Sequence, residues 1–329
     1  MKICIIQGPF KPIPDVAGGS LEKRWYKLAL EFVKKGHKVF YISKKTKKFK
    51  DKEFSKGINH TRVRGFKFPK SIFLIKIFDL IYSFRACKAV PEDCDIIISN
   101  TFFSPLLLND SLKKKNYISV ERMPKGQMFL YKKSARFRGN SMHVVNKIKN
   151  ELPKNERNKV KLIPNPLPFS SNRKIKKNFN NKTILYAGRI HPEKGLRELV
   201  KAFATLPKEL LQEWTLHVRG PYLQEQGGQG RGFLDELKNL ASPVSKNVNF
   251  LEPAFDEDTL RDDLNEASLF VYPSLADRGE TFGLAVLEAM SCGCPPLVSA
   301  LDCFRDFVDE GKTGFVFDHR ASDVASALR

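Results

Sequence analysis

Short apolar segments alternate with amphipathic segments throughout the first half of the chain. Runs without polar interruption, such as residues 96–98, are typical of β-strands that are covered on both faces. Residues 20–35 have the spacing of an amphipathic helix, and Gly36 supplies its stop signal. We therefore expect a parallel sheet flanked by helices, with strands at residues 2–7, 38–43, 95–99, 117–120, 142–145 and 160–163.

A second series of strands and helices follows a break in this pattern. Residues 169–182 lose the apolar periodicity and gain charge, which predicts a linker. The sequence thus predicts an α/β protein of two Rossmann-like domains, residues 1–168 and 183–329. Because parallel sheets bind ligands at the carboxyl ends of their strands, we expect the two domains to face a shared cleft. The strands of the second domain are expected at residues 183–187, 215–218, 248–251, 269–272, 296–299 and 314–317.

The chain termini and the cysteines indicate a cytoplasmic protein. The first apolar segment is too short for a signal peptide, and no run of about 20 apolar residues could cross a bilayer. Six cysteines are few for 329 residues and lack zinc-like spacing, so we expect buried free thiols in a reducing compartment. Residues 322–329 keep an amphipathic pattern without a stop signal, so we expect a carboxyl-terminal helix that continues past the last residue.

The net charge of +21 is distributed unevenly along the chain. Residues 1–182 contain 42 Lys and Arg against 13 Asp and Glu, a net +29, whereas the remainder contains 15 against 23, a net −8. A lysine-rich genome would affect both halves alike, so the asymmetry favours a polyanionic partner for the first half. An anionic membrane surface or a phosphorylated acceptor fits this expectation. Nucleic acid is not expected, because no recognised nucleic-acid motif accompanies the charge.

Residues 66–85 combine apolar and basic side chains and leave two interpretations open. An interfacial helix has such a composition. A helix whose apolar residues nearly encircle it is instead typical of a buried core position.

The polar loop before a helix expected near Phe282 is the segment richest in candidate chemistry. Helix amino termini have unpaired N–H groups and partial positive charge, so the amides of Phe282, Gly283 and Leu284 are suited to a diphosphate. Glu280 directly precedes this terminus, and Glu288 lies about two turns along the helix. Two carboxylates in these positions can contact different hydroxyl-rich parts of one ligand. Taken alone, Glu280 could equally be a helix cap and Glu288 a solvated residue.

The surrounding residues carry a family resemblance. The segment 279–293, Gly-Glu-Thr-Phe-Gly-Leu-Ala-Val-Leu-Glu-Ala-Met-Ser-Cys-Gly, resembles the signature of retaining glycosyltransferases of family 4, which have the GT-B fold. The similarity covers nearly the whole chain and is strongest from residue 183 onward. Three further segments match the family pattern, namely residues 187–195, the pair Gly18-Gly19 after the first strand, and residues 163–166.

The resemblance implies roles for these residues. Arg189 and Lys194 match the basic pair that binds the donor diphosphate and stabilises the charge that grows as the glycosidic bond breaks. Glu280 matches the acid that contacts the donor sugar, and Glu288 the acid that binds the ribose. The backbone of Gly18 and Gly19 would approach the phosphates, since glycine has no side chain in the way. Fixed cations can replace a metal, so neither a metal nor another cofactor is expected.

The resemblance therefore implies a retaining, metal-independent hexosyltransferase with a front-face mechanism. Its expected donor is a UDP- or GDP-linked sugar, and its expected acceptor is a glycan or a lipid-linked molecule in cell-surface polysaccharide synthesis. Together with the basic first half, this predicts a cytoplasmic enzyme that is peripheral at the inner face of the cell membrane.

Two alternatives and one departure accompany this interpretation. A nucleotide-sugar 2-epimerase would share the fold, although the spacing of Glu280 and Glu288 argues against it. A dinucleotide-dependent oxidoreductase would carry G-x-G-x-x-G after the first strand, and this chain lacks it. Many family members have a histidine after the strand at 117–120, where this chain has Glu121-Arg122.

Overall fold

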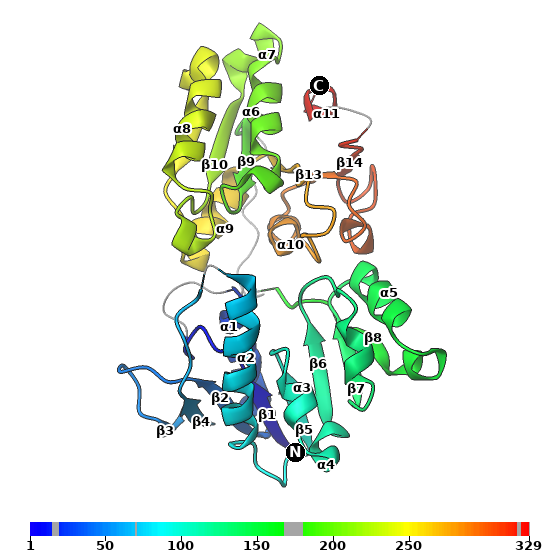
Figure 1. Ribbon diagram of the computed structural model, residues 1–329. Coiled ribbons are helices and arrows are strands. Elements are labelled where there is room, and N and C mark those ends of the chain that lie inside the picture. The colour runs from blue at the N-terminus through cyan, green and yellow to red at the C-terminus, as the bar shows by residue number, and fades with distance from the viewer. Residues whose placement is uncertain (15–19, 70, 168–179, 321–323, 329) are drawn as a thin grey trace. The chain divides into compact units, whose positions relative to one another are not determined.

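The computed structural model describes residues 1–14, 20–69, 71–167, 180–320 and 324–328. The chain divides into two compact units, Met1–Pro164 and Asn165–Arg329 (Figure 1). We call them the amino-terminal and carboxyl-terminal units and describe each by itself. Most of the predicted linker, residues 168–179, lies outside the described residues.

The amino-terminal unit contains an eight-stranded sheet with the order β3-β4-β2-β1-β5-β6-β7-β8. All neighbouring strands are parallel except β3 and β4, which form an antiparallel pair. The chain runs outward from β1 in both directions, so the topological switch point lies between β1 and β5. The strands are β1 (Lys2–Ile6), β2 (Lys38–Lys44), β3 (Lys52–Ser55), β4 (Ile58–Val63), β5 (Ile96–Ser99), β6 (Asn116–Val120), β7 (Arg136–Gly139) and β8 (Val160–Leu162).

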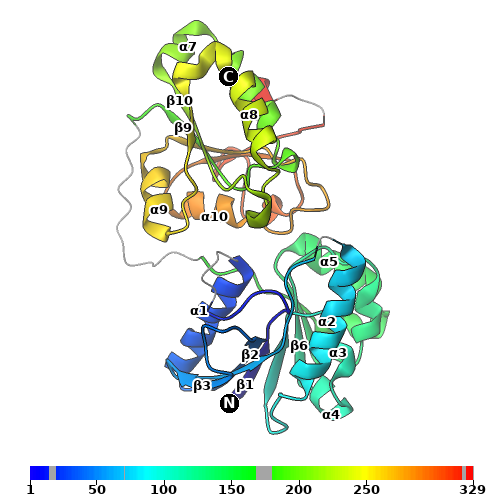
Figure 2. The same cartoon turned by 60° about the vertical axis from the view of Figure 1, so that its left-hand side comes forward.

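Helices cover both faces of this sheet, as the alternation of side chains along β1 shows. Ile3 and Ile5 pack in one buried cluster with Trp25 of α1, whereas Cys4 and Ile6 pack in another with Tyr82 of α2. Figure 2 shows α1 and α2 on opposite sides of the strands. The helices are α1 (Ser20–Lys34), α2 (Ile72–Cys87), α3 (Ser104–Leu107), α4 (Asp110–Lys113) and α5 (Met142–Glu151).

The strand predicted at residues 142–145 is wrong, because this segment forms the first turn of α5. Ser141 has an extended backbone, and its side chain accepts a hydrogen bond from the amide of Val144, which starts the helix. The apolar residues of this segment face the core at helical spacing, which in so short a window resembles a strand. The strand at this place in the sheet is β7, which the prediction missed along with the β3–β4 hairpin.

The sequence of α2 left two interpretations open, an interfacial helix and a buried core helix, and the structure agrees with each only in part. Its buried residues are Asp79, Tyr82, Ser83 and Ala86. The Asp79 carboxylate accepts hydrogen bonds from the amides of Phe102 and Phe103 at 3.1 and 3.0 Å, and burial raises its pKa to about 6. One side of α2 is thus anchored by a polar contact, whereas several of its apolar side chains remain exposed, namely Ile72, Phe73, Leu74, Leu80, Ile81 and Phe84.

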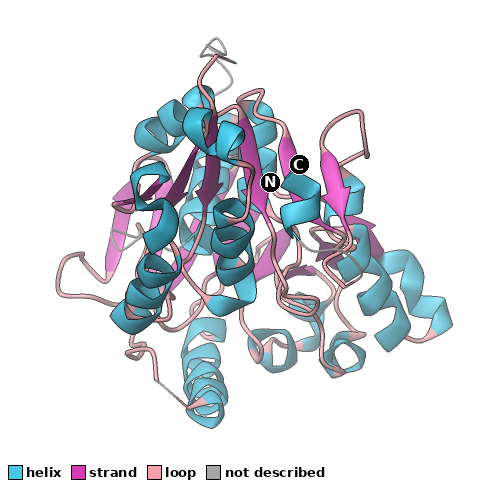
Figure 3. Ribbon diagram, turned by 90° about the horizontal axis from the view of Figure 1, so that it is seen from above, coloured by secondary structure: helices cyan, strands magenta, loops and turns pink. Residues whose placement is uncertain are grey.

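The carboxyl-terminal unit is a six-stranded parallel sheet with the order β11-β10-β9-β12-β13-β14. Its six predicted strands are confirmed, with ends that differ by at most one residue. One continuous apolar core joins this sheet to the helices that border it. Figure 3 shows helices alongside the strands. The strands are β9 (Thr183–Ala187), β10 (Thr215–Arg219), β11 (Val248–Leu251), β12 (Leu269–Tyr272), β13 (Pro296–Ser299) and β14 (Phe315–Phe317); the helices are α6 (Leu196–Ala204), α7 (Lys208–Glu213), α8 (Arg231–Leu240), α9 (Glu257–Glu266), α10 (Leu284–Ser291) and α11 (Val324–Leu328).

All six cysteines are free, and five of them are buried, as expected, whereas Cys87 is partly exposed. Burial raises the pKa of Cys87 to about 12 and raises that of Cys303 as well. Because the thiolate is the reactive form, these two thiols are poor nucleophiles at neutral pH. Within the described ranges, none of the helices is long and apolar enough to span a bilayer.

Candidate active site

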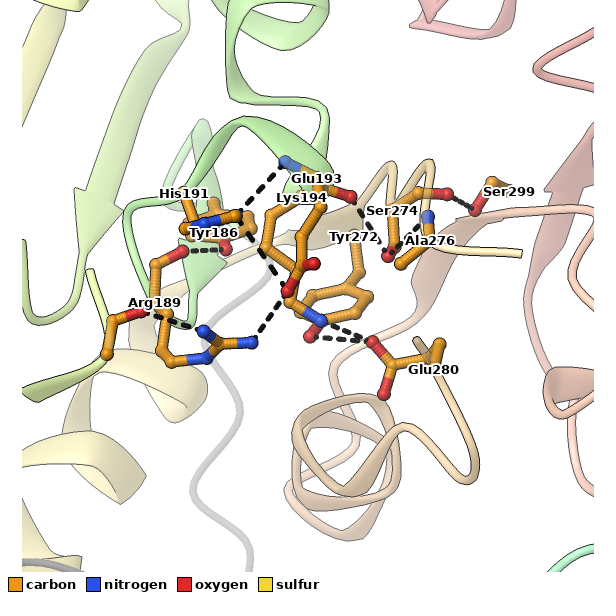
Figure 4. A network of polar contacts seen from close by, with 11 residues as sticks. Tyr186, Arg189, His191, Glu193, Lys194, Tyr272, Ser274, Ala276, Glu280 and Ser299 are labelled. Carbon is orange, nitrogen blue, oxygen red and sulfur yellow. Dashed lines mark hydrogen bonds and ion pairs between the residues drawn. The ribbon is translucent and has the colours of Figure 1, made fainter. Parts of the chain in front are cut away.

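A buried ion pair joins two loops of the carboxyl-terminal unit. Lys194 Nζ donates to Glu280 Oε2 at 2.6 Å, and the two side chains are only 7% and 13% exposed. The hydroxyl of Tyr272 donates to the same oxygen at 3.2 Å (Figure 4). The loops follow β9 and β12, which are neighbours in the sheet, so both lie at its carboxyl edge. The structure thus brings together two predicted site residues that are 86 positions apart in the chain.

Local backbone geometry explains how Lys194 reaches this position. Lys194 ends a short 3₁₀ turn, Pro192–Lys194, whose amino terminus is capped by the His191 side chain. The next residue, Gly195, has a φ of +70° and starts α6. A Cβ atom there would lie 2.0 Å from the carbonyl oxygen of Pro273, so only glycine fits. This close approach connects the lysine loop to the loop that carries Glu280.

Ser274 and Ser299 strengthen the connection between these two loops. The Leu275 amide donates to the carbonyl of Glu193 at 2.8 Å, and Ser274 Oγ donates to the same carbonyl at 3.4 Å. Ser299 Oγ, at the end of β13, donates to the Ser274 carbonyl at 2.6 Å. Both serines are fully buried. The sequence prediction missed them and Tyr272, although a polar residue at the carboxyl end of a buried strand, or just past it, is the signal that marks all three.

Arg189 lies in the same loop as Lys194 but is more exposed. Its guanidinium donates to the Gly227 carbonyl and to Glu193 Oε1, each at 2.7 Å. Its side chain is 43% exposed, so the ion pair with Glu193 is largely screened by solvent. Arg189 is therefore a solvent-accessible cation at the edge of the site, unlike the buried Lys194.

The amino terminus of α10 provides a second source of positive potential. The helix begins at Leu284, two residues later than predicted, with Gly283 as its cap at a φ of +78°. A Cβ atom on Gly283 would lie 2.2 Å from the buried ring of Phe304. The first amides of a helix have no partner within it and carry partial positive charge. Phe282 is 4% exposed, so only its backbone is suited to contact a ligand.

The remaining predicted site residues are Glu288, Gly18 and Gly19. Glu288 lies on α10 and is partly exposed. Gly18 and Gly19 lie outside the described residues.

The electrostatic environment favours an uncharged tyrosine next to the ion pair. Burial raises the pKa of Tyr272 well above its usual value, and the nearby Glu280 carboxylate raises it further. Tyr272 is therefore a hydrogen-bond donor at neutral pH. Its ring lies 5.3 Å from Lys194 Nζ, a cation–π distance, and stacks on the ring of Tyr186 at 5.8 Å. These contacts hold the lysine and the carboxylate in one arrangement, which is what a preorganised electrostatic site requires.

The arrangement is suited to bind an anion beside a hydroxyl-bearing group. Lys194 has three N–H donors, and Glu280 is an acceptor with two oxygens, of which Oε2 receives both Lys194 and Tyr272. Among the residues that the structure describes, no group of three or more His, Cys, Asp or Glu side chains could hold a metal ion.

Comparison with protein-family models matches residues 169–329 to the family "Glycosyl transferases group 1". Two curated relatives are similar in sequence to part of the chain. They are the D-inositol 3-phosphate glycosyltransferase of Rhodococcus jostii, 34% identical over 153 residues, and the O-antigen chain mannosyltransferase B of Escherichia coli, 34% identical over 146 residues. Each match covers 44% of this chain but only 31% and 34%, respectively, of the relatives. The sequence likeness is thus confined to about a third of each relative's length.

Solved structures extend the likeness in fold to both units. Sucrose-phosphate synthase from Thermosynechococcus elongatus has a TM-score of 0.77 at 20% identity and covers 100% of this chain and 88% of its own. Anabaena Alr3699/HepE, in a complex with UDP and glucose, has a TM-score of 0.67 at 16% identity, with 100% and 89% covered. These likenesses confirm the predicted α/β fold of the GT-B class.

Proposed function

We propose that the chain is a retaining glycosyltransferase of the glycosyl transferases group 1, the family whose model matches residues 169–329, and that it uses a nucleotide-sugar donor. The observation that carries the proposal is the buried Lys194–Glu280 pair in the unit that matches the family. The acceptor is a glycan or a lipid-linked molecule in cell-surface polysaccharide synthesis. One relative, an O-antigen chain mannosyltransferase, supports that setting by its name.

In this proposal, positively charged groups of the site bind the donor diphosphate, and two carboxylates bind the donor hydroxyls. Lys194, Arg189 and the first amides of α10 bind the diphosphate, because each supplies N–H donors with positive charge. Glu280 accepts hydrogen bonds from hydroxyls of the transferred sugar, and Glu288 accepts them from the ribose. The base is uracil or guanine. The complex of Anabaena Alr3699/HepE with UDP and glucose supports a UDP-linked sugar.

The proposed reaction breaks the bond between the anomeric carbon and the diphosphate oxygen and forms a bond to the acceptor oxygen on the same face. The acceptor proton moves to the leaving phosphate oxygen, so the atoms balance without a covalent enzyme intermediate. Negative charge grows on the diphosphate, and in this proposal Lys194 supplies the fixed cation that stabilises it. Because side chains and helix amides supply this charge, we propose that the enzyme requires neither a metal nor another cofactor.

A thermal-unfolding series with nucleotide sugars tests this proposal. A nucleotide sugar that binds only the folded chain stabilises it by about 2.7 kcal/mol at a concentration of 100 times its Kd. We expect a clear rise in the unfolding temperature with a UDP- or GDP-sugar and none with NAD. Product analysis then separates transfer from 2-epimerisation of the donor. If no nucleotide sugar raises the unfolding temperature, the proposed function is wrong.

We also propose that the enzyme works at the cytoplasmic face of the membrane and that α2 contacts an anionic bilayer. Phe73 and Phe84 on α2 are 70% and 54% exposed, and Lys88 Nζ lies 4.3 Å from the centre of the Phe84 ring. Exposed aromatic side chains beside lysines are typical of helices that lie in the interface plane. The excess of basic residues in this half of the chain is complementary to anionic lipids.

Replacing both phenylalanines by serine is expected to weaken sedimentation with phosphatidylglycerol vesicles by roughly tenfold or more, since burial of one such side chain contributes about 1.5–3 kcal/mol. The matched control is Phe54→Ser, because Phe54 lies on β3 and is 72% exposed. High salt should also release the wild-type chain, because charge contributes to the binding. Equal binding of the double variant and the control would exclude α2 as the contact.

A further inference from the structure

Two buried tyrosines lie next to the candidate site in the carboxyl-terminal unit (Figure 4). Tyr186 is on β9 and Tyr272 is on β12, and these strands are neighbours in the sheet. The two rings are nearly parallel, with an angle of 8° between their planes and 5.8 Å between their centroids. Tyr186 is fully buried, and Tyr272 is 6% exposed. Packing on both sides therefore leaves the rings little freedom to move.

The hydroxyls of the two tyrosines contact different segments of the site. Tyr186 Oη donates to the backbone carbonyl of Arg189 at 2.8 Å, and Tyr272 Oη donates to Glu280 Oε2 at 3.2 Å. Burial raises the pKa of both tyrosines well above its usual value, so both hydroxyls are protonated donors at neutral pH. Each ring thus connects the apolar core to one of the two loops that carry the candidate site.

The hydrogen bond from Tyr272 determines which oxygen of Glu280 is available to a ligand. Oε2 accepts from Lys194 Nζ at 2.6 Å and from Tyr272 Oη. A carboxylate has about four acceptor positions, two on each oxygen, so the protein occupies both positions of Oε2. Oε1 has no hydrogen-bond partner within the part of the chain that the structure describes. The carboxylate is therefore held with Oε1 as its open acceptor.

Stability of the core does not account for these two hydroxyls. Burying a hydroxyl costs free energy that its hydrogen bond only offsets, and phenylalanine has nearly the same shape without that cost. The same core contains phenylalanines that are equally well buried, namely Phe203, Phe270 and Phe304. At Tyr186 and Tyr272, by contrast, the buried side chain has a hydroxyl that contacts a loop of the site.

From this geometry we infer that Tyr186 and Tyr272 are positioning residues with separate tasks. Tyr186 fixes the backbone at Arg189 and so places that cation for the donor diphosphate. Tyr272 orients Glu280 so that Oε1 accepts a hydrogen bond from a hydroxyl of the transferred sugar. The inference rests on the proposed function in naming these two ligand groups, whereas the positioning is a property of the chain without ligand.

Hydrogen exchange of the ligand-free full chain tests the positioning. Tyr186→Phe keeps the ring and removes only the hydroxyl, so the amides of residues 188–195 should exchange about fivefold faster, the effect of losing one hydrogen bond. The amides of residues 276–283 should be unchanged. Tyr272→Phe should show the reverse pattern, because the Glu280 side chain anchors the turn in which its amide donates to the Ala276 carbonyl.

The control for both variants is Tyr117→Phe. Tyr117 lies on β6 in the amino-terminal unit and is 38% exposed. This variant also loses one phenolic hydroxyl and should change the exchange of neither loop. Unchanged exchange in both loops of Tyr186→Phe and Tyr272→Phe would overturn the inference.

Isothermal titration with UDP and UDP-glucose tests the separate tasks, with GDP and GDP-mannose in their place if only guanine nucleotides bind. Tyr186→Phe should raise the Kd of both ligands about fivefold, because both contain the diphosphate. Tyr272→Phe should raise the Kd of UDP-glucose about fivefold and leave that of UDP within about twofold of wild type, because only the sugar contacts Glu280.

The two measurements distinguish failure of the inference from failure of the proposed function. If Tyr272→Phe weakens UDP and UDP-glucose by the same factor, it damages the site as a whole and the separate tasks are wrong. If the exchange pattern appears but no nucleotide binds, the positioning holds and the proposed function is wrong.

Discussion

Replacing Lys194 by methionine is expected to lower kcat for sugar transfer by about two to three orders of magnitude, the usual effect of removing one preorganised donor to a developing negative charge. Methionine approximates the apolar stem of lysine but lacks the ammonium that contacts Glu280 at 2.6 Å. The measurement is the steady-state rate with the nucleotide sugar that stabilises the chain best. Lys201→Met is the matched control, because Lys201 is exposed on α6 and lies outside the ion pair.

Stability and catalysis must be separated in this experiment. Lys194→Met alone leaves the Glu280 carboxylate buried without its cation, which destabilises a protein by about 3 kcal/mol or more. The double variant Lys194→Met/Glu280→Gln removes that buried charge and should recover much of the unfolding temperature. We expect it to recover none of the rate, because the cation is still missing. A double variant that regains activity along with stability would show that Lys194 has a structural role only.

The second large effect is expected for Gly283→Ala, at the cap of α10. A side chain at a φ of +78° costs about 1–2 kcal/mol, and forcing a methyl group into the buried Phe304 ring adds about 1–3 kcal/mol. The sum should appear as a lower free energy of unfolding in a urea titration. Affinity for the donor should fall as well, since the first amides of α10 would shift.

Gly311→Ala separates the cost of the backbone conformation from the cost of the clash with Phe304. Gly311 has a φ of +72° in the same unit, but a Cβ atom there would meet no heavy atom within 4 Å. It should therefore show the conformational cost of about 1–2 kcal/mol without the clash. Equal losses in the two variants would mean that the Phe304 ring moves aside and that Gly283 is required only for its backbone conformation.

Much of the architecture follows from the order of residues along the chain. Buried parallel strands are continuous apolar runs, so the strands of the carboxyl-terminal unit could be predicted to within one residue. The unequal charge of the two halves is likewise a property of composition. The position of Glu280 close to the amino terminus of α10 could be inferred from the sequence, because both lie in one short segment. Helix geometry then sets the spacing between residues along α10.

Only the tertiary structure determines which distant residues are in contact and which faces of the elements are exposed to solvent. Lys194 contacts Glu280 because β9 and β12 are neighbours in the sheet, and strand order cannot be read from apolar periodicity. The same holds for the contacts of Glu121 with Arg24 and Arg138, because Arg24 lies on α1, Glu121 directly follows β6 and Arg138 lies on β7. Helix α2 has an apolar sequence, yet its buried side includes the Asp79 carboxylate and several of its apolar side chains are exposed. Local interactions determine the elements of this protein, whereas its charged sites depend on contacts between segments that are far apart in the chain.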